Sequence, residues 1–152
     1  MPLSLGTRAP DFTLSDQLGA PVSLQSFLGK QVVVLYFYPY DETHGCTAEA
    51  CRFRDEYEVF TAAGAEVIGV SGDSVVSHAE FAAHHRLPFT LLSDRDGAVR
   101  KRYRVGRQLL FIPARTTFII DRAGIIRGVF SHLFSATEHV GEALRVVRSL
   151  AP

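Results

Sequence analysis

The sequence is poor in cysteine, has no excess of charge of either sign and contains no long apolar run. Lys plus Arg equals Asp plus Glu at 16 each, so the formal net charge is zero. A general affinity for nucleic acid or for an anionic membrane needs sustained positive charge, which is missing. The longest apolar run, residues 32–38, is far too short to span a bilayer. We therefore expect neither nucleic acid nor a membrane as a partner.

The N-terminus has no charged stretch followed by an apolar one, so it does not resemble a secretory signal. We therefore expect the protein in the cytoplasm. Cysteines in that reducing compartment are more often catalytic or metal-binding than structural. The two cysteines, Cys46 and Cys51, become the first candidates for function.

The order of hydrophobic patterns predicts one α/β domain spanning residues 1–152. Apolar and β-branched runs predict strands, and amphipathic periods with end signals predict helices. The predicted strands are 12–14, 22–24, 32–38, 65–71, 89–92, 115–120 and 125–130, and the predicted helices are 46–62, 75–86, 97–103 and 137–150. A β-α-β opening, a late antiparallel hairpin and a final helix imply a mixed central sheet flanked by helices. That order, with its N-terminal β-hairpin, matches the thioredoxin-like fold.

The segment that carries chemistry lies where the strand at 32–38 passes into the first long helix. Cys46 falls in the first turn of that helix, where unpaired N–H groups and the helix dipole stabilise a thiolate. Thr43 is placed to cap the helix, with a hydroxyl that can accept from its N–H groups and donate to a bound oxygen. Pro39 ends the strand and can shield the thiolate from water. Gly45 allows close backbone approach.

Cys51 follows Cys46 by five residues. In an intact helix this spacing separates the two Cα atoms by about 8–9 Å. A disulfide requires less than about 7 Å. The two sulfurs can therefore bond only if the first turns unwind, unlike those of a Cys-x-x-Cys site.

Several motifs in order resemble the peroxiredoxins. Pro39-x-x-x-Thr43-x-x-Cys46 matches their signature, and Cys46-Thr-x-Glu-Ala-Cys51 is similar to the peroxiredoxin Q, or bacterioferritin comigratory protein, subfamily. The resemblance covers nearly the whole chain and extends to Gly6-x-x-Ala-Pro-Asp-Phe12, Gly69-Val-Ser-Gly-Asp-Ser74, Leu87-Pro-Phe-Thr-Leu-Leu-Ser-Asp94 and Pro113-x-Arg-Thr-Thr-Phe-Ile-Ile-Asp121.

The resemblance implies a thiol peroxidase in which Cys46 attacks a hydroperoxide and Cys51 resolves the sulfenic acid as an intramolecular disulfide. Thr43 would bond thiolate and peroxide, and Pro39 would shield the pocket. The reductant would be a thioredoxin or a similar dithiol. Sulfur carries the redox change, so no metal or other cofactor is expected.

The resemblance also implies roles for two charged residues. Arg115 would place its guanidinium beside the sulfur, where a fixed positive charge stabilises the thiolate and polarises the peroxide. Glu49 would support the charge arrangement around the site.

The chain departs from the family at His44, where proline is usual, and at Tyr40, which replaces a common lysine. Losing a proline at the first helical position should make that turn easier to unwind. A protonated His44 would also stabilise the thiolate. An exposed histidine without a role is the alternative.

Two alternatives to the peroxidase stay open, a thiol–disulfide oxidoreductase acting on proteins and a peroxide-sensing redox relay. His78, His84 and His85 could suggest a metal site, but no carboxylate at a suitable sequence spacing completes a ligand set, so we expect none. An intramolecular resolving cysteine needs no second subunit, so we expect a monomer.

Overall fold

The computed structural model describes residues 2–108, 112–113, 115–131 and 136–150. Its main sheet has seven strands in the order β2-β1-β5-β4-β3-β8-β9. The strands are β1 (Thr13–Ser15), β2 (Pro21–Ser23), β3 (Val32–Phe37), β4 (Ala65–Ser71), β5 (Thr90–Ser93), β8 (Thr116–Ile120) and β9 (Ile126–Phe130). The helices are α1 (His44–Asp55), α2 (Tyr57–Ala62), α3 (Val75–His85), α4 (Ala98–Arg102) and α5 (Ala136–Ser149), with a 3-10 turn η1 (Leu24–Ser26).

The sheet is mixed, as the sequence predicts. β3 pairs with β4 and β4 with β5 in parallel, whereas β3 pairs with β8 and β8 with β9 antiparallel. A parallel pair needs a crossover, which α1 with α2, and then α3, supply. The predicted thioredoxin-like fold with its N-terminal hairpin is confirmed.

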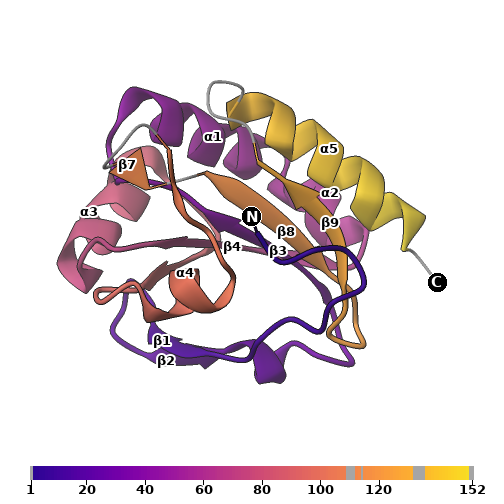
Figure 1. Cartoon of the computed structure of the whole chain (residues 1–152). Coiled ribbons are helices and arrows are strands. Elements are labelled where there is room, and N and C mark those ends of the chain that lie inside the picture. The colour runs from indigo at the N-terminus through magenta and orange to yellow at the C-terminus, as the bar shows by residue number, and fades with distance from the viewer. Residues whose placement is uncertain (1, 109–111, 114, 132–135, 151–152) are drawn as a thin grey trace.

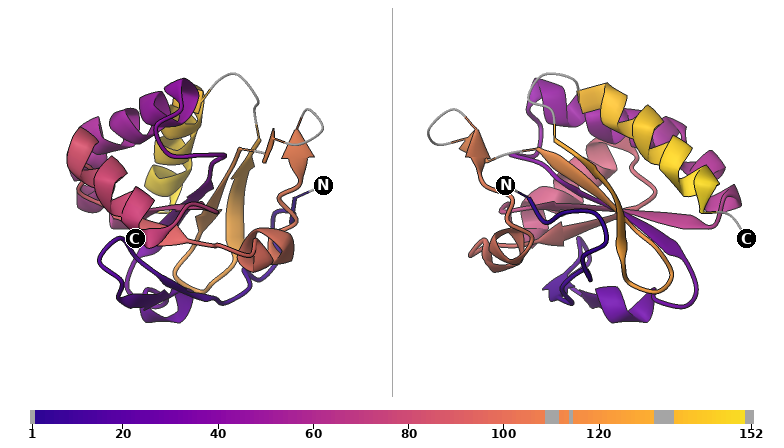
Figure 2. Two further views of the ribbon diagram at one scale, coloured as in Figure 1. Left: turned by 90° about the vertical axis from the view of Figure 1, so that its left-hand side faces the viewer. Right: turned by 45° about the vertical axis from the view of Figure 1, so that its right-hand side comes forward.

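Alternate side chains of β3 feed two separate apolar cores. Val34 and Tyr36 belong to one core with Ala50 and Phe53 of α1. Val33 and Leu35 belong to the other core. Because successive side chains of a strand point to opposite faces, a strand buried throughout requires cover on both faces. Helices α1, α2, α3 and α5 cover one face, and α4 with the N-terminal segment covers the other (Figures 1 and 2).

The single helix predicted over residues 46–62 is wrong, because the chain bends between α1 and α2. Glu56 has φ −99° and ψ 4°, which lies outside the helical region. The bend turns α2 toward β4, where the Tyr57 hydroxyl donates to Glu66 at 2.8 Å. No proline or glycine marks this point in the sequence.

A two-stranded ribbon is the other element that the sequence patterns missed. It consists of β6 (Arg107–Gln108) and β7 (Ile112–Pro113), which pair antiparallel. Strands this short carry too few residues for an alternating pattern to show.

No helix in the described ranges is long and apolar enough to cross a membrane.

Candidate active site

Cys46 lies in the first turn of α1 and is buried, with 1% of its surface exposed. The turn forms because Thr43 takes an extended conformation and its carbonyl accepts from the Thr47 N–H at 2.8 Å. Thr43 is therefore the N-cap residue, as predicted. The thiol faces the apolar core with Ala50 while its backbone stays at the positive end of the helix.

Arg115 is the residue just before β8, and its side chain reaches the Cys46 thiol. Its Nη2 donates to Cys46 Sγ at 3.5 Å and its Nη1 donates to Glu49 Oε1 at 2.8 Å. A Cβ added to Gly45 would lie 3.2 Å from that Nη2. Gly45 thus allows the close approach that the sequence predicts, and the guanidinium joins the thiol to the carboxylate.

Glu49 is fully buried, and its ionisation is affected strongly by that burial. Burial raises the pKa of Glu49 to about 7, although the Arg115 guanidinium counteracts part of the rise. Burial works to lower the pKa of Arg115, but Glu49 and Cys46 together raise it above its ordinary value. Arg115 therefore stays charged beside the thiol across the neutral range.

Two residues that the sequence analysis missed extend this group. His139 of α5 is buried with Nδ1 at 3.7 Å from Glu49 Oε2, and it shares a hydrogen bond of 3.0 Å with Thr117 Oγ1. Tyr36 is buried near the site, and burial together with the charges of Glu49 and Cys46 raises its pKa. His139 lies next to Val140 on the buried side of α5. The only sequence feature that could have identified it is a histidine within an apolar stripe.

Three buried polar atoms have no hydrogen-bond partner among the described residues. They are Tyr36 OH, Glu49 Oε2 and Arg115 Nε. Such atoms are rare in folded proteins, and each costs about 1–3 kcal/mol. Their grouping around one thiol marks a site that retains polar capacity for a ligand.

The Thr43 hydroxyl does not cap the helix, contrary to the prediction. It donates to the Tyr40 carbonyl at 3.1 Å, and the side chain accepts from no helix N–H. Its contact with the thiolate or a peroxide stays a prediction.

Pro39 and His44 lie beside the site. Pro39 is half-buried and lines a cavity of about 330 Å³ at the ends of β3 and β4, which does not include Cys46. Its shielding role stays a prediction. His44 is the first residue of α1 and is exposed.

Cys51 is half-exposed on the same unbroken helix as Cys46, and both are free thiols. Helix geometry therefore keeps the two Cα atoms about 8–9 Å apart, beyond disulfide reach. Cys51 lines a second cavity, of about 450 Å³, together with Glu42, His44 and His85. The structure thus separates the two cysteines, as their spacing predicts.

The three histidines that raised the question of a metal do not lie together. His78 is buried against Asp41, with His78 Nδ1 at 2.7 Å from Asp41 Oδ2. His84 and His85 both contact Glu42, a carboxylate far away in the sequence. The expectation that no carboxylate accompanies these histidines is therefore wrong, because the fold supplies one from the loop before α1.

Comparison with known proteins places this site in a family. Residues 5–129 match the AhpC/TSA family. The chain is 50% identical over 149 residues to peroxiredoxin Q, chloroplastic, of Oryza sativa subsp. japonica, covering 97% of this chain and 68% of that protein. It is 51% identical over 146 residues to the peroxiredoxin Q of Sedum lineare, covering 95% and 78%.

Comparison with solved structures indicates the same family. The peroxidoxin BcpB of Mycobacterium tuberculosis superimposes with a TM-score of 0.92 at 39% identity, covering 99% of each chain. The bacterioferritin comigratory protein of Xanthomonas campestris, which has alkyl peroxide reduction activity, superimposes with a TM-score of 0.87 at 29% identity, covering 99% of this chain and 98% of that one. The chain belongs to the AhpC/TSA family, as a thiol peroxidase of the peroxiredoxin Q type.

Proposed function

We propose that Cys46 reduces hydrogen peroxide and organic hydroperoxides, and that Cys51 resolves the oxidised product. One observation carries the proposal: Arg115 places a permanent positive charge 3.5 Å from a buried thiol at a helix N-terminus. Both features favour the thiolate, which is the nucleophile.

In the first step the Cys46 thiolate attacks the distal oxygen of ROOH. The O–O bond breaks, ROH leaves after taking up a proton, and Cys46 becomes a sulfenic acid. Arg115 stabilises the negative charge that develops on the leaving oxygen. The Thr43 hydroxyl must turn from the Tyr40 carbonyl to bind the peroxide, and Pro39 shields the thiolate.

In the second step the first turns of α1 unwind. The Cys51 thiolate attacks the sulfenic sulfur, the S–S bond forms as the S–O bond breaks, and the departing hydroxide takes up a proton to leave as water. An external dithiol, such as a thioredoxin, then reduces the disulfide by exchange and returns α1 to its folded form. In each step the redox change of the protein takes place on sulfur.

We also propose that the protein works as a monomer in a reducing compartment such as the cytoplasm. Both cysteines lie in one chain, so resolution needs no second copy, and both must be reduced to begin the cycle. Sedimentation of the reduced protein at micromolar concentration should give the mass of one chain, and a dimer mass would contradict this.

Peroxide consumption with thioredoxin, measured for Cys46→Ser and Cys51→Ser, tests the mechanism. Cys46→Ser should be inactive, and Cys51→Ser should consume about one peroxide per chain and then stop. Full turnover in Cys51→Ser would remove Cys51 from the cycle but keep the peroxidase. Insulin reduction faster than peroxide consumption would favour a thiol–disulfide oxidoreductase.

A further inference from the structure

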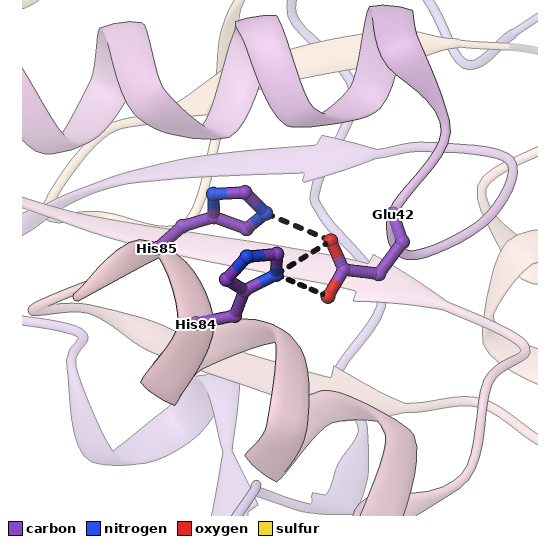
Figure 3. A group of neighbouring side chains, drawn as sticks. All are labelled: Glu42, His84 and His85. Carbon is purple, nitrogen blue, oxygen red and sulfur yellow. Dashed lines mark hydrogen bonds and ion pairs between the residues drawn. The ribbon is translucent and has the colours of Figure 1, made fainter.

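Glu42, His84 and His85 form a compact cluster at the surface. Glu42 and His85 line the same cavity as Cys51, and Cys46 does not line it. His84 Nδ1 lies 3.0 Å from Glu42 Oε2, and His85 Nε2 lies 2.8 Å from Glu42 Oε1. Figure 3 shows both imidazoles directing one nitrogen each at the same carboxylate, with the two rings side by side. Glu42 belongs to the loop between β3 and α1, and the histidines end α3.

The dimensions of this cluster suit a small transition-metal ion. The candidate ligand atoms all lie within 4.8 Å of one another. Ligands at about 2.0–2.1 Å in a tetrahedral site stand about 3.3 Å apart, so the N–O distances of 2.8–3.2 Å need to open only slightly. Imidazole and carboxylate are ligands that Zn²⁺ accepts, and three protein ligands leave a fourth position open.

Charge and access at the cluster also favour a cation. The two histidines lie in the last turn of α3, where the helix dipole is negative. His84 and Glu42 are well exposed, at 66% and 46%, so an ion can enter from solvent.

A second group of similar composition consists of Asp41, Asp73 and His78. It is less suited to a metal ion. Its polar atoms are already used within the fold: His78 Nε2 bonds the Leu92 carbonyl, and Asp73 Oδ2 accepts from the Ser71 hydroxyl and the Asp41 N–H. A metal there would have to displace several buried hydrogen bonds.

We propose that Glu42, His84 and His85 bind a divalent transition-metal ion of the Zn²⁺ class, and that the bound ion holds the start of α1 folded. Glu42 immediately precedes Thr43, the N-cap of α1, so an ion on Glu42 fixes that turn to the end of α3. The Arg54 guanidinium, which donates to the His85 carbonyl at 2.8 Å, already fixes the far part of α1 to the same place.

The second part of this proposal rests on the proposed function. If Cys51 can reach Cys46 only after the start of α1 unwinds, a metal that binds the folded form opposes resolution. An ion present at 100 times its dissociation constant, with no affinity for the unwound segment, lowers the unwound population about 100-fold. Metal would then leave Cys46 longer as the sulfenic acid.

Calorimetric titration of tag-free, reduced protein with ZnCl2 tests the site itself. Wild type should bind one Zn²⁺ per chain, and Glu42→Gln and His84→Ala should each weaken binding at least about tenfold, since even supporting residues around a metal contribute that much. Glu58→Gln, an exposed carboxylate on α2, is the matched control and should bind like wild type. Cobalt absorption should report the same order of affinities.

Three results would overturn the site. The first is no zinc binding by wild type at millimolar metal, and the second is unchanged binding in Glu42→Gln. Binding that disappears only in a Cys46→Ser/Cys51→Ser double variant would place the ion on the thiols and also overturn it. The Glu42 and His84 side chains are both exposed, so the variants that replace them should fold.

Disulfide formation after one equivalent of peroxide tests the second part, with and without saturating Zn²⁺. Zinc should slow resolution severalfold or more in wild type and leave it unchanged in Glu42→Gln at the same free metal concentration. A change below twofold in wild type would contradict the coupling. If no disulfide forms even with EDTA, the proposed resolution by Cys51 fails, whereas the calorimetric result on the site still stands.

Discussion

We expect the reactivity of Cys46 to depend most on Arg115, because one guanidinium contacts two partners. Its two terminal nitrogens contact the thiol and Glu49 at the same time. A lysine has a single ammonium and cannot donate in this fork geometry. Arg115 therefore holds the thiol and Glu49 in position and supplies a positive charge to the site.

We predict that Arg115→Lys slows oxidation of Cys46 by about 10²- to 10³-fold, the usual effect of removing a donor to a developing negative charge. Stopped-flow measurement of sulfenic acid formation checks this. Arg127→Lys is the matched control, because the exposed Arg127 side chain of β9 pairs with Asp121 away from the thiol, and this change should leave the rate unchanged. A less than fivefold effect of Arg115→Lys would contradict the role.

Glu49 gives the folded protein a specific pH dependence. Its pKa is raised from 4.5 to about 7, so the folded state holds this proton over a range in which the unfolded chain has lost it. The contribution of Glu49 to stability is therefore greatest below about pH 4.5 and decreases as the pH rises to about 7. Glu49→Gln removes the titration.

We predict that Glu49→Gln gains stability relative to wild type as the pH rises from 4.5 to 7, by an amount on the order of 3 kcal/mol. Urea unfolding of both proteins with reduced thiols, at pH 5 and pH 8, measures the difference. Glu58→Gln should show no such trend. A difference that shrinks with rising pH would mean that Arg115 outweighs burial.

The residues of the site differ in how far the sequence predicts them. Cys46 and Gly45 follow from the helix start, and Arg115 and Glu49 follow from the family motifs. His139 could not be predicted, because a histidine within an apolar stripe has the same pattern as a core residue. The capping role predicted for the Thr43 hydroxyl is wrong, since the hydroxyl donates to a local carbonyl instead.

At the scale of elements, the loop between β3 and α1 is held on α3 by a buried cluster. Asp41 accepts from the Ser77 hydroxyl at 2.7 Å and lies 2.7 Å from His78 Nδ1. The side chains of His78 and Asp41 are 0% and 2% exposed. This cluster fixes the approach to α1, and it lies outside the turns that the proposed resolution step would unwind.

Removing one partner of this buried pair should therefore destabilise the whole fold. We predict that Asp41→Ala costs about 3 kcal/mol of unfolding free energy, because His78 loses its carboxylate in a buried place. Asp55→Ala, whose carboxylate pairs with Arg54 at the surface, should cost less than about 1 kcal/mol. Equal losses in the two variants would contradict this view of the loop.

His44 sits where α1 begins, so it is the position at which unwinding can be altered without touching the thiols. Proline there pre-sets the helical φ, and such substitutions stabilise by about 0.4–1 kcal/mol. We predict that His44→Pro slows disulfide formation about two- to fivefold. His44→Ala separates the effects, since it removes the imidazole without fixing φ. Slowing by alanine and not by proline would assign the effect to charge.

At the scale of the whole molecule, the proposed cycle requires local unwinding of α1 beside a stable sheet. The sequence predicts the sheet well, because runs buried on both faces and a late hairpin are strong patterns. It does not predict where α1 gives way to α2, since a change of ψ at Glu56 has no residue signature. The bend at Glu56 bears on how far α1 can unwind, because aromatic contacts hold α2 and the last turn of α1.

Phe53 marks the limit of unwinding. Its ring stacks on Tyr36 at a centroid distance of 4.7 Å and packs on Phe60 at 5.7 Å, all within the buried core. Cys51 precedes it by two residues on the less buried side. Disulfide formation needs residues 44–51 to leave the helix, whereas freeing Phe53 would expose a large apolar side chain at a cost of about 1.5–3 kcal/mol.

We predict that oxidation to the disulfide raises amide hydrogen exchange over residues 44–51 and leaves residues 53–62 protected. The sheet strands β3 and β4 should also keep their protection, because they lie at the centre of both cores. Exchange followed by mass spectrometry on reduced and oxidised protein measures each segment, and Cys51→Ser treated with peroxide controls for oxidation of Cys46 alone. Unchanged protection over 44–51 would show that the helix need not unwind. Loss of protection through 62 would show that the aromatic contacts of Phe53 do not stop it.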